Sequence, residues 1–174
     1  MRAFSCCVLF ALTVLATPSQ AQPAPPAPVA PKPSPLVADI RRWLHATQWG
    51  EIFQGGVRRE LGERVKDNPV AQRLLAAPPA EIESVVAPIF AMWLSQPEAR
   101  AMADFYESST GQRINAQQAA QLAEPDPAVR LTVPQRLEYE RFAAGVGGQG
   151  VRRILGNSTL RDQYIPALLQ HFQR

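Results

Sequence analysis

The sequence predicts an all-α protein, folded as a single compact bundle of about six to eight helices. Between Leu36 and Arg174, apolar residues recur with helical spacing, and no alternating pattern typical of a strand continues for five residues. Helix-capping signals and the spacing of Pro and Gly divide this stretch into segments of helical length. Because 46% of the residues are hydrophobic, the chain has enough apolar side chains to bury a core.

The first 35 residues differ from the rest and predict two segments. Residues 1–21 read as a secretory signal peptide, with Arg2, an apolar run from Ala3 to Ala16, and a small-x-small cleavage sequence that ends at Ala21. The apolar run is shorter than the roughly 20 residues that cross a bilayer. Residues 22–35 contain seven Pro and are typical of an extended polyproline linker. The folded domain is expected at residues 36–174.

Cleavage after Ala21 would place the mature protein in the periplasm and remove Cys6 and Cys7, the two cysteines of the chain. The mature chain would then form no disulfide and offer no thiolate for catalysis or metal binding. Two alternatives stay open: an uncleaved signal that serves as an anchor, and a linker that docks a proline-reading partner. A formal net charge of +3 is too small for this length to indicate a nucleic-acid partner.

Four helices are expected in the first half of the domain. The first follows Pro35 and places Ile40, Trp43 and Leu44 on one face, and the second runs from about Trp49 to Lys66. The third is short, is capped at Asn68-Pro69 and ends near Leu75. The fourth begins at Pro78-Pro79, is kinked at Pro88, and carries an apolar stripe formed by Ile82, Val85, Val86, Ile89, Phe90 and Trp93.

The second half contains a pattern that occurs twice, 37 residues apart. Leu94-Ser95-Gln96-Pro97-Glu98 and Leu131-Thr132-Val133-Pro134-Gln135 both fit a capping box, in which a Ser or Thr precedes Glu or Gln by three residues. The same displacement aligns Phe105 with Phe142 and Gly111 with Gly148. We predict two helix-turn-helix units, at 94–123 and 131–156, separated by Pro125 and Pro127. A last helix is expected from about Thr159 to Phe172.

The helix after the first capping box ends in a distinctive stretch, Phe105-Tyr106-Glu107-Ser108-Ser109-Thr110-Gly111-Gln112. With Leu94 to Glu98 before it, this stretch resembles a bacterial family, the domain-of-unknown-function family 2059. Its members share an export signal, an all-helical domain and a Phe-Tyr-x-Ser-x-x-Gly-Gln/Lys corner. They commonly have Pro after the Ser, where this chain has Ser109. The resemblance implies a fold and an exported location, and no defined activity.

The signature residues are expected to be structural. Ser108 can cap the second helix of its unit, and Gly111 would allow two helices to cross closely. Adjacent helical residues diverge by about 100°, so Phe105 should face the core and Tyr106 its edge. For Tyr106 two interpretations stay open: a buried ring with a hydrogen-bonded hydroxyl, or a contact to a ligand or partner. Gln112 completes the signature.

The sequence contains no recognisable catalytic constellation. The stretch from Gly145 to Gly150 spells G-x-G-x-x-G, but a helix precedes it where a dinucleotide site needs a strand. His45 and His171 lie near opposite ends of the domain, so neither a metal nor a cofactor is expected. Surface ion pairs are expected between Glu60 and Arg64 and between Arg100 and Asp104.

Arg152 and Arg153 form the densest basic spot of the domain, with Arg161 nearby. This spot is either a solvated face or a contact for an anionic envelope polymer or lipid head group.

The function expected from these observations is that of a non-catalytic exported module that binds an envelope protein or a small ligand. Two alternatives remain. One is an envelope enzyme that uses a carboxylate or Ser site which the spacing does not reveal. The other is a membrane-anchored structural protein that keeps its signal.

Overall fold

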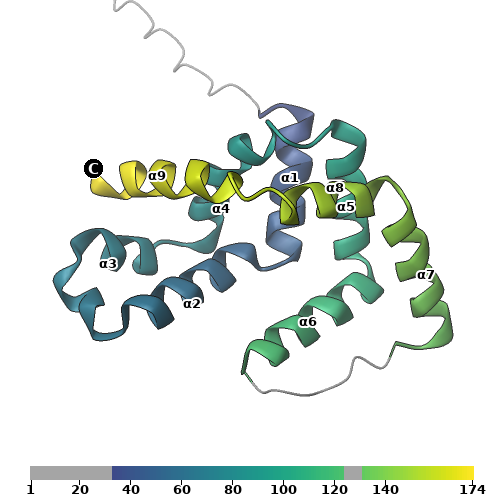
Figure 1. Ribbon diagram of the computed structural model, residues 1–174, viewed down its shortest axis with the longest axis horizontal. Coiled ribbons are helices and arrows are strands. Elements are labelled where there is room, and N and C mark those ends of the chain that lie inside the picture. The colour runs from purple at the N-terminus through teal and green to yellow at the C-terminus, as the bar shows by residue number, and fades with distance from the viewer. Residues whose placement is uncertain (1–32, 124–130) are drawn as a thin grey trace, which may run out of the picture. The chain divides into compact units, whose positions relative to one another are not determined.

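The computed structural model describes residues 33–123 and 131–174, and within them the side chains of all but 118–123 (Figure 1). The predicted signal peptide, most of the linker, and Pro125 and Pro127 lie outside these residues. The described residues contain no strand, which confirms the all-α class. Their helices, somewhat more than the six to eight expected, are α1 (Pro35–Ala46), α2 (Trp49–Leu61), the 3₁₀ helix η1 (Gly62–Asp67), α3 (Pro69–Ala76), α4 (Pro79–Phe90), α5 (Gln96–Glu107), α6 (Ser109–Ala123), α7 (Val133–Ala144), α8 (Val146–Leu155) and α9 (Leu160–Gln173).

Local capping explains where the first helices begin. The Ser34 hydroxyl accepts a hydrogen bond from the Val37 N–H at 3.3 Å, and the Asn68 side chain accepts one from the Ala71 N–H at 3.0 Å. In both helices Pro follows the cap, at a position where its missing N–H costs nothing. The starts of α1 and α3 therefore agree with the prediction.

Two predicted helix ends are wrong. The second helix was expected to reach Lys66, but α2 ends at Leu61, because Gly62 adopts a φ of +50° that glycine tolerates and other residues rarely do. The chain continues as η1 up to Asp67. α4 runs through Pro88 and ends at Phe90, so Trp93 lies in the following turn, where its indole N–H donates to the Gln163 side chain at 2.9 Å.

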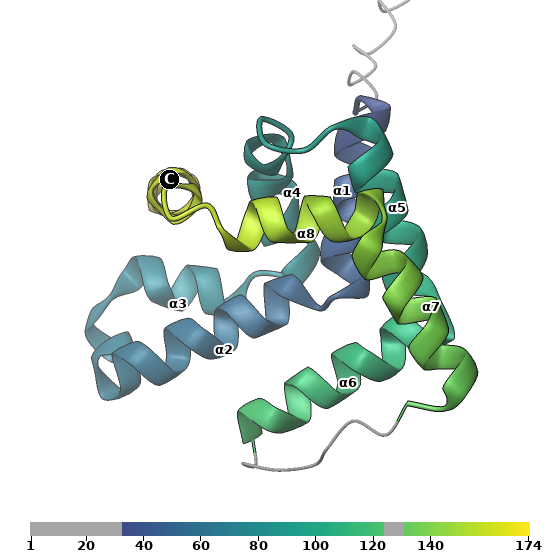
Figure 2. The ribbon, with the colours of Figure 1, turned by 45° about the vertical axis from the view of Figure 1, so that its right-hand side comes forward.

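The core forms around α1, α4 and α5 (Figures 1 and 2). Phe90 of α4 lies at its centre, with its ring 5.5 Å from that of Trp43, 5.9 Å from Trp49 and 6.3 Å from Tyr164. α9 packs on α4, and α8 crosses α5. The fully buried side chains with the largest volumes are Phe90, Ile40, Leu44, Ile82, Met102, Leu168, Val86 and Thr110.

Two arms lead away from this core (Figure 2). The first is an antiparallel hairpin formed by α2, η1 and α3. The second is α6. In α2 only Gly50 is fully buried, and an added Cβ there would lie 2.8 Å from Pro79 at the start of α4. The hairpin is therefore held closely at one end and leaves apolar surface between itself and α9.

The two helix-turn-helix units have the expected local structure. Both capping boxes are formed, by Ser95 with Glu98 at the start of α5 and by Thr132 with Gln135 at the start of α7. α5 leads into α6 at Ser108, and α7 leads into α8 at Gly145. The Gly145–Gly150 stretch thus follows a helix and opens another, as the sequence indicated.

Candidate functional site

The signature corner between α5 and α6 is held by backbone contacts. The Ser108 hydroxyl accepts a hydrogen bond from the Gly111 N–H at 3.2 Å. An added Cβ on Gly111 would lie 2.2 Å from the Phe105 carbonyl oxygen, and one on Gly148 would lie 2.2 Å from the Ala143 carbonyl oxygen. Both glycines therefore bring the two helices of their unit into backbone contact, and Ser108 and Gly111 have structural roles.

Phe105 and Tyr106 face different surroundings, as their adjacency predicted. Phe105 is buried and stacks on Phe142 with ring centres 3.8 Å apart, which joins the two units. Tyr106 is half-buried and meets the rings of Phe105 and Phe142 edge-on. Its hydroxyl makes no hydrogen bond to any other described residue, so both interpretations of Tyr106 stay predictions.

The remaining signature residue, Gln112, belongs to the corner itself. Its side-chain amide donates to the Glu107 carbonyl oxygen at 3.2 Å. This bond ties the first turn of α6 to the last residue of α5. Of the five signature residues, Tyr106 is the one whose polar group has no partner among the described residues.

Arg152 and Arg153 already have partners within the protein. The Arg152 guanidinium donates to the Ala143 carbonyl oxygen at 2.7 Å, and Arg153 lies 3.0 Å from the Glu98 carboxylate. Glu98 is buried, and burial alone would raise its pKa. Hydrogen bonds from the Ser95 N–H and hydroxyl, with the charge of Arg153, outweigh burial and lower the pKa of Glu98. Arg153 thus ties α8 to α5, and Arg152 ties α8 to the end of α7.

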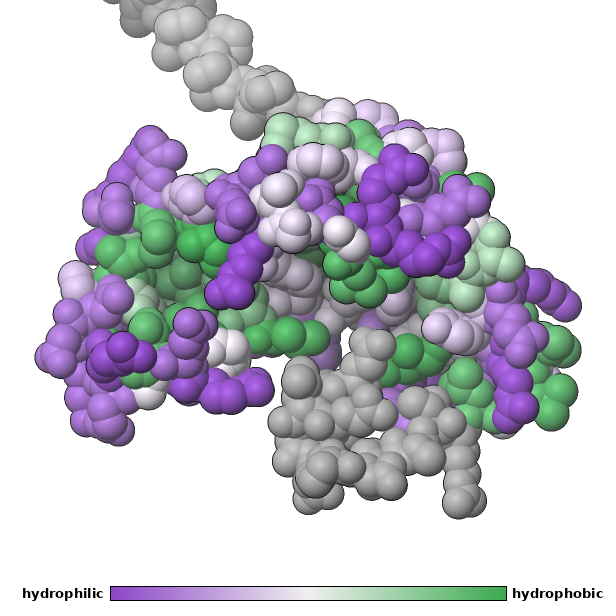
Figure 3. Space-filling view, viewed as in Figure 1, coloured by the Kyte–Doolittle hydropathy of each residue, from purple (hydrophilic) through white to green (hydrophobic). Residues whose placement is uncertain are grey.

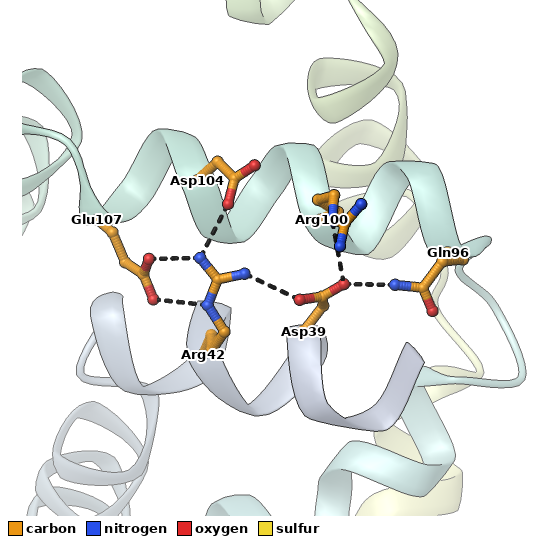
Figure 4. A network of polar contacts seen from close by, with 6 residues as sticks. All are labelled: Asp39, Arg42, Gln96, Arg100, Asp104 and Glu107. Atoms are coloured by element: carbon orange, nitrogen blue, oxygen red, sulfur yellow. Dashed lines mark hydrogen bonds and ion pairs between the residues drawn. The ribbon is translucent and has the colours of Figure 1, made fainter. Parts of the chain in front are cut away.

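A polar network that the sequence analysis missed joins α1 to α5 (Figure 4). Arg42 of α1 donates to Glu107 at 2.6 and 3.1 Å, to Asp104 at 2.8 Å and to Asp39 at 2.9 Å. These hydrogen bonds raise the pKa of the Arg42 guanidinium above its ordinary value, and those to Glu107 have the largest effect. Glu107 and Asp104 lie more than 60 residues from Arg42 in the sequence, so no local spacing reveals the network.

Asp39 anchors the other end of this network. Its side chain is buried, accepts a hydrogen bond from Gln96 and lies 3.9 Å from Arg100. The partners of Asp39 and of Arg42 follow one another in the same order along α5, so α1 and α5 run parallel (Figure 4). Because the charges are satisfied within the network, we assign it to the stability of the fold.

The network also corrects two predicted ion pairs. Asp104 pairs with Arg42 instead of Arg100, and Arg100 pairs with Asp39. Arg64 donates to the Glu60 carbonyl oxygen at 3.1 Å and forms no ion pair with the Glu60 carboxylate. Spacing of four residues allows such pairs, but better-oriented partners from other helices, or the backbone, are preferred here.

The two histidines contact different glutamates of α4. His171 lies 2.8 Å from Glu81, and the exposed His45 lies 3.9 Å from Glu83. Within residues 33–123 and 131–174, no three His, Cys, Asp or Glu side chains gather as metal ligands would. Of these two glutamates, Glu83 is the unusual one, because it is only 3% exposed and its Oε1 has no hydrogen-bond partner among the described residues.

Burial raises the pKa of Glu83 above its ordinary value of 4.5, against the opposing charge of His45 and a hydrogen bond from the Gly50 N–H. The folded protein therefore keeps the Glu83 proton at a pH where the unfolded chain has lost it, and the stability that this proton contributes falls as the pH rises through the raised pKa. We expect Glu83→Gln to gain stability relative to the natural protein between pH 4 and pH 8, as measured by urea unfolding. Two unfolding free energies that change in parallel over this range would contradict the assignment.

The α9 pocket, which we define as the cavity between α9 and the α2–α3 hairpin, has a volume of about 490 Å³. Most of the described residues that line it are apolar, among them Phe53 and Val57 of α2, Leu74 of α3, and Ile165 and Leu169 of α9. Figure 3 shows this apolar surface on the left of the view, between α9 and the hairpin, with hydrophilic side chains around it. No pattern in the sequence indicated this pocket, because its walls come from helices about 100 residues apart.

Polar side chains lie at the border of the α9 pocket. Glu60, Arg161 and Asp162 line it, and none of them forms an ion pair with another described residue. A mainly apolar cavity with a few polar groups at its border is the usual form of a small-molecule site. The α9 pocket can therefore take up an apolar group and still contact a polar end.

Comparisons with known proteins agree with the resemblance seen in the sequence. Neither the curated proteins nor the solved structures give a match to the chain. The matched family segment contains the signature corner, whereas the described residues that line the α9 pocket all lie outside it. Residues 80–128 match the family model DUF2059, "Uncharacterized protein conserved in bacteria".

Proposed function

We propose that the protein is an exported, non-catalytic binding module of the periplasm, and that the α9 pocket holds its ligand. The observation that carries this proposal is the pocket itself: about 490 Å³ of mainly apolar space at the border of the core. A cavity of this size accommodates a drug-sized molecule or a few apolar side chains. Because its walls are mainly apolar, we expect the pocket to bind a ligand by removing apolar surface from water, and not to catalyse a reaction of that ligand.

The proposed location rests on the N-terminal sequence. Residues 1–21 have the charged start, apolar run and cleavage sequence of a signal peptide. In the part of the chain that the structure describes, no helix has both the length and the apolar character to cross a membrane. If the proposal is right, the protein recovered from the periplasm begins at Gln22, as mass spectrometry would show. A chain that keeps residues 1–21 would favour an anchored protein.

The ligand that fits this site has an apolar body. Phe53, Val57 and Ile165 offer it aromatic and aliphatic contacts, and Leu168 forms part of the pocket floor. Burial of apolar ligand surface contributes about 25 cal/mol per Å² before the costs of association. A polar end would remain at the border, near Glu60 or Arg161.

Binding can be tested with N-phenyl-1-naphthylamine, a neutral apolar probe whose fluorescence rises out of water. We expect the natural protein to bind the probe, and Leu169→Asp to weaken binding at least tenfold, because it places a carboxylate at the pocket wall. Leu137→Asp is the matched control, since Leu137 is 47% exposed against 44% for Leu169 and lines none of the pockets described.

Both variants should keep their thermal melting within a few degrees of the natural protein, because each replaces an exposed side chain. Equal affinities of the two variants for the probe would remove the α9 pocket as the ligand site.

A further inference from the structure

Tyr106, whose hydroxyl has no hydrogen-bond partner among the described residues, lines a second cavity, the Tyr106 pocket. This cavity has a volume of about 230 Å³, is lined by side chains of α1, α2, α5, α6 and α8, and shares none of its described lining residues with the α9 pocket. Trp43, Trp49 and Tyr106 give it aromatic walls, and the exposed Ile52 and Leu155 lie at its border. Aromatic side chains with exposed apolar neighbours are typical of a site that takes up an apolar group.

Three other polar groups of this pocket are already used or covered. The Thr47 hydroxyl lies 3.0 Å from the carbonyl oxygens of both Trp43 and Leu44, which share its proton. The Asn115 amide donates to the Ala46 carbonyl oxygen at 2.7 Å. The Trp43 Nε1 has no partner but is sealed from solvent by its neighbours. None of the described residues that line the pocket is charged. Among the described lining side chains, the Tyr106 hydroxyl and the Trp49 indole N–H are therefore the proton donors that a bound molecule could meet.

We propose that the Tyr106 pocket is a second binding site, for a small neutral aromatic molecule that carries a carbonyl group. A cavity of roughly 150 Å³ holds benzene, so about 230 Å³ accommodates one ring with a short substituent. The ring would contact Trp49 and the aliphatic wall formed by Val151 and Ile154. The carbonyl oxygen would accept a hydrogen bond from the Tyr106 hydroxyl, which has no partner among the described residues.

Two further observations support this site. Burial raises the pKa of Tyr106, so its hydroxyl stays protonated and able to donate at neutral pH. Gln48, which joins α1 to α2, adopts a φ of +53°, and the residues on both sides of it, Thr47 and Trp49, line the pocket. A non-glycine residue in this conformation is uncommon and indicates that the surrounding structure fixes the corner.

The test compares two probes of nearly equal shape, acetophenone and isopropylbenzene, in which a methyl group replaces the carbonyl oxygen. Binding is followed by NMR through the indole N–H signals of the three tryptophans, in the exported protein as purified. We expect both probes to shift the signals of Trp43 and Trp49, and to leave that of Trp93, which does not line the pocket. The ratio of the acetophenone affinity to the isopropylbenzene affinity, which we call the preference for acetophenone, should be about tenfold higher when the Tyr106 hydroxyl is present, because acetophenone alone accepts its hydrogen bond.

Tyr106→Phe removes only the hydroxyl and should lower this preference about tenfold while leaving the affinity for isopropylbenzene unchanged. Tyr139→Phe is the control, because Tyr139 does not line the pocket and its replacement should change neither affinity. The proposal is overturned if neither probe shifts Trp43 and Trp49, or if Tyr106→Phe retains the preference. These outcomes are independent of Leu169→Asp, which tests the α9 pocket.

Discussion

Replacement of Gly111 by Ala should lower the free energy of unfolding by about 2–3 kcal/mol. The added methyl group would lie 2.2 Å from the Phe105 carbonyl oxygen and 2.6 Å from the Tyr106 Cα, both of which are backbone atoms. Neither atom can move without shifting the end of α5 away from α6. Gly148→Ala should have a similar effect, because its methyl group would meet the backbone of Ala143 at 2.2 Å.

Gly55→Ala provides the control for this experiment. Gly55 lies within α2, and nothing lies within 4 Å of an added Cβ. Alanine is a better helix former than glycine, so this change should raise stability by about 1 kcal/mol. Urea unfolding of the three variants measures these effects. If Gly111→Ala proved as stable as Gly55→Ala, this result would contradict the close backbone contact between α5 and α6.

Replacement of Arg42 by Met should lower the free energy of unfolding by about 1–2 kcal/mol. Methionine keeps the apolar part of the side chain and removes the guanidinium, so Asp39 stays buried and keeps only Gln96 and the more distant Arg100 as partners. Removal of one member of a fully buried pair costs roughly 3–5 kcal/mol. The expected effect is smaller, because the Arg42 side chain is 41% exposed and solvent screens it.

Lys66→Met is the matched control for Arg42→Met. Lys66 pairs with Glu63 on the surface of η1, and both side chains are almost fully exposed. Such pairs contribute between about 0 and 1 kcal/mol, so the variant should unfold at nearly the same urea concentration as the natural protein. An equal loss of stability in the two variants would show that the α1–α5 network has no special role.

Helix starts, and the two helix-turn-helix units, could be predicted because the signals for them are local. A cap and its partner lie three residues apart, as Ser95 and Glu98 do, so their pairing is visible in the sequence. In the same way, Gly111 in the first turn of α6 predicted that α6 crosses closely over α5. The end of α2 was missed, because four glycines lie between Trp49 and Lys66 and nothing local shows that Gly62 is the one with positive φ.

The polar network and both pockets could not be predicted, because they depend on which helices meet. Arg42 and Glu107 are 65 residues apart, and the local pairs expected for Arg64 and Arg100 gave way to other partners. The α9 pocket exists because Phe53 and Val57 of α2 are only partly covered, although Arg73 of α3 donates to the Phe172 carbonyl oxygen of α9. A one-dimensional pattern shows that these side chains are apolar, and it does not show that they remain uncovered.

The proposal that the α9 pocket is a ligand site is tested most directly by an NMR titration of the purified protein with N-phenyl-1-naphthylamine. We predict that the backbone amide signals that shift belong to α2, α3 and α9, with Val57, Ala71 and Leu168 among them, and that Leu169→Asp suppresses these shifts. Shifts that are absent, or that are as large in Leu169→Asp as in the natural protein, would contradict the proposal.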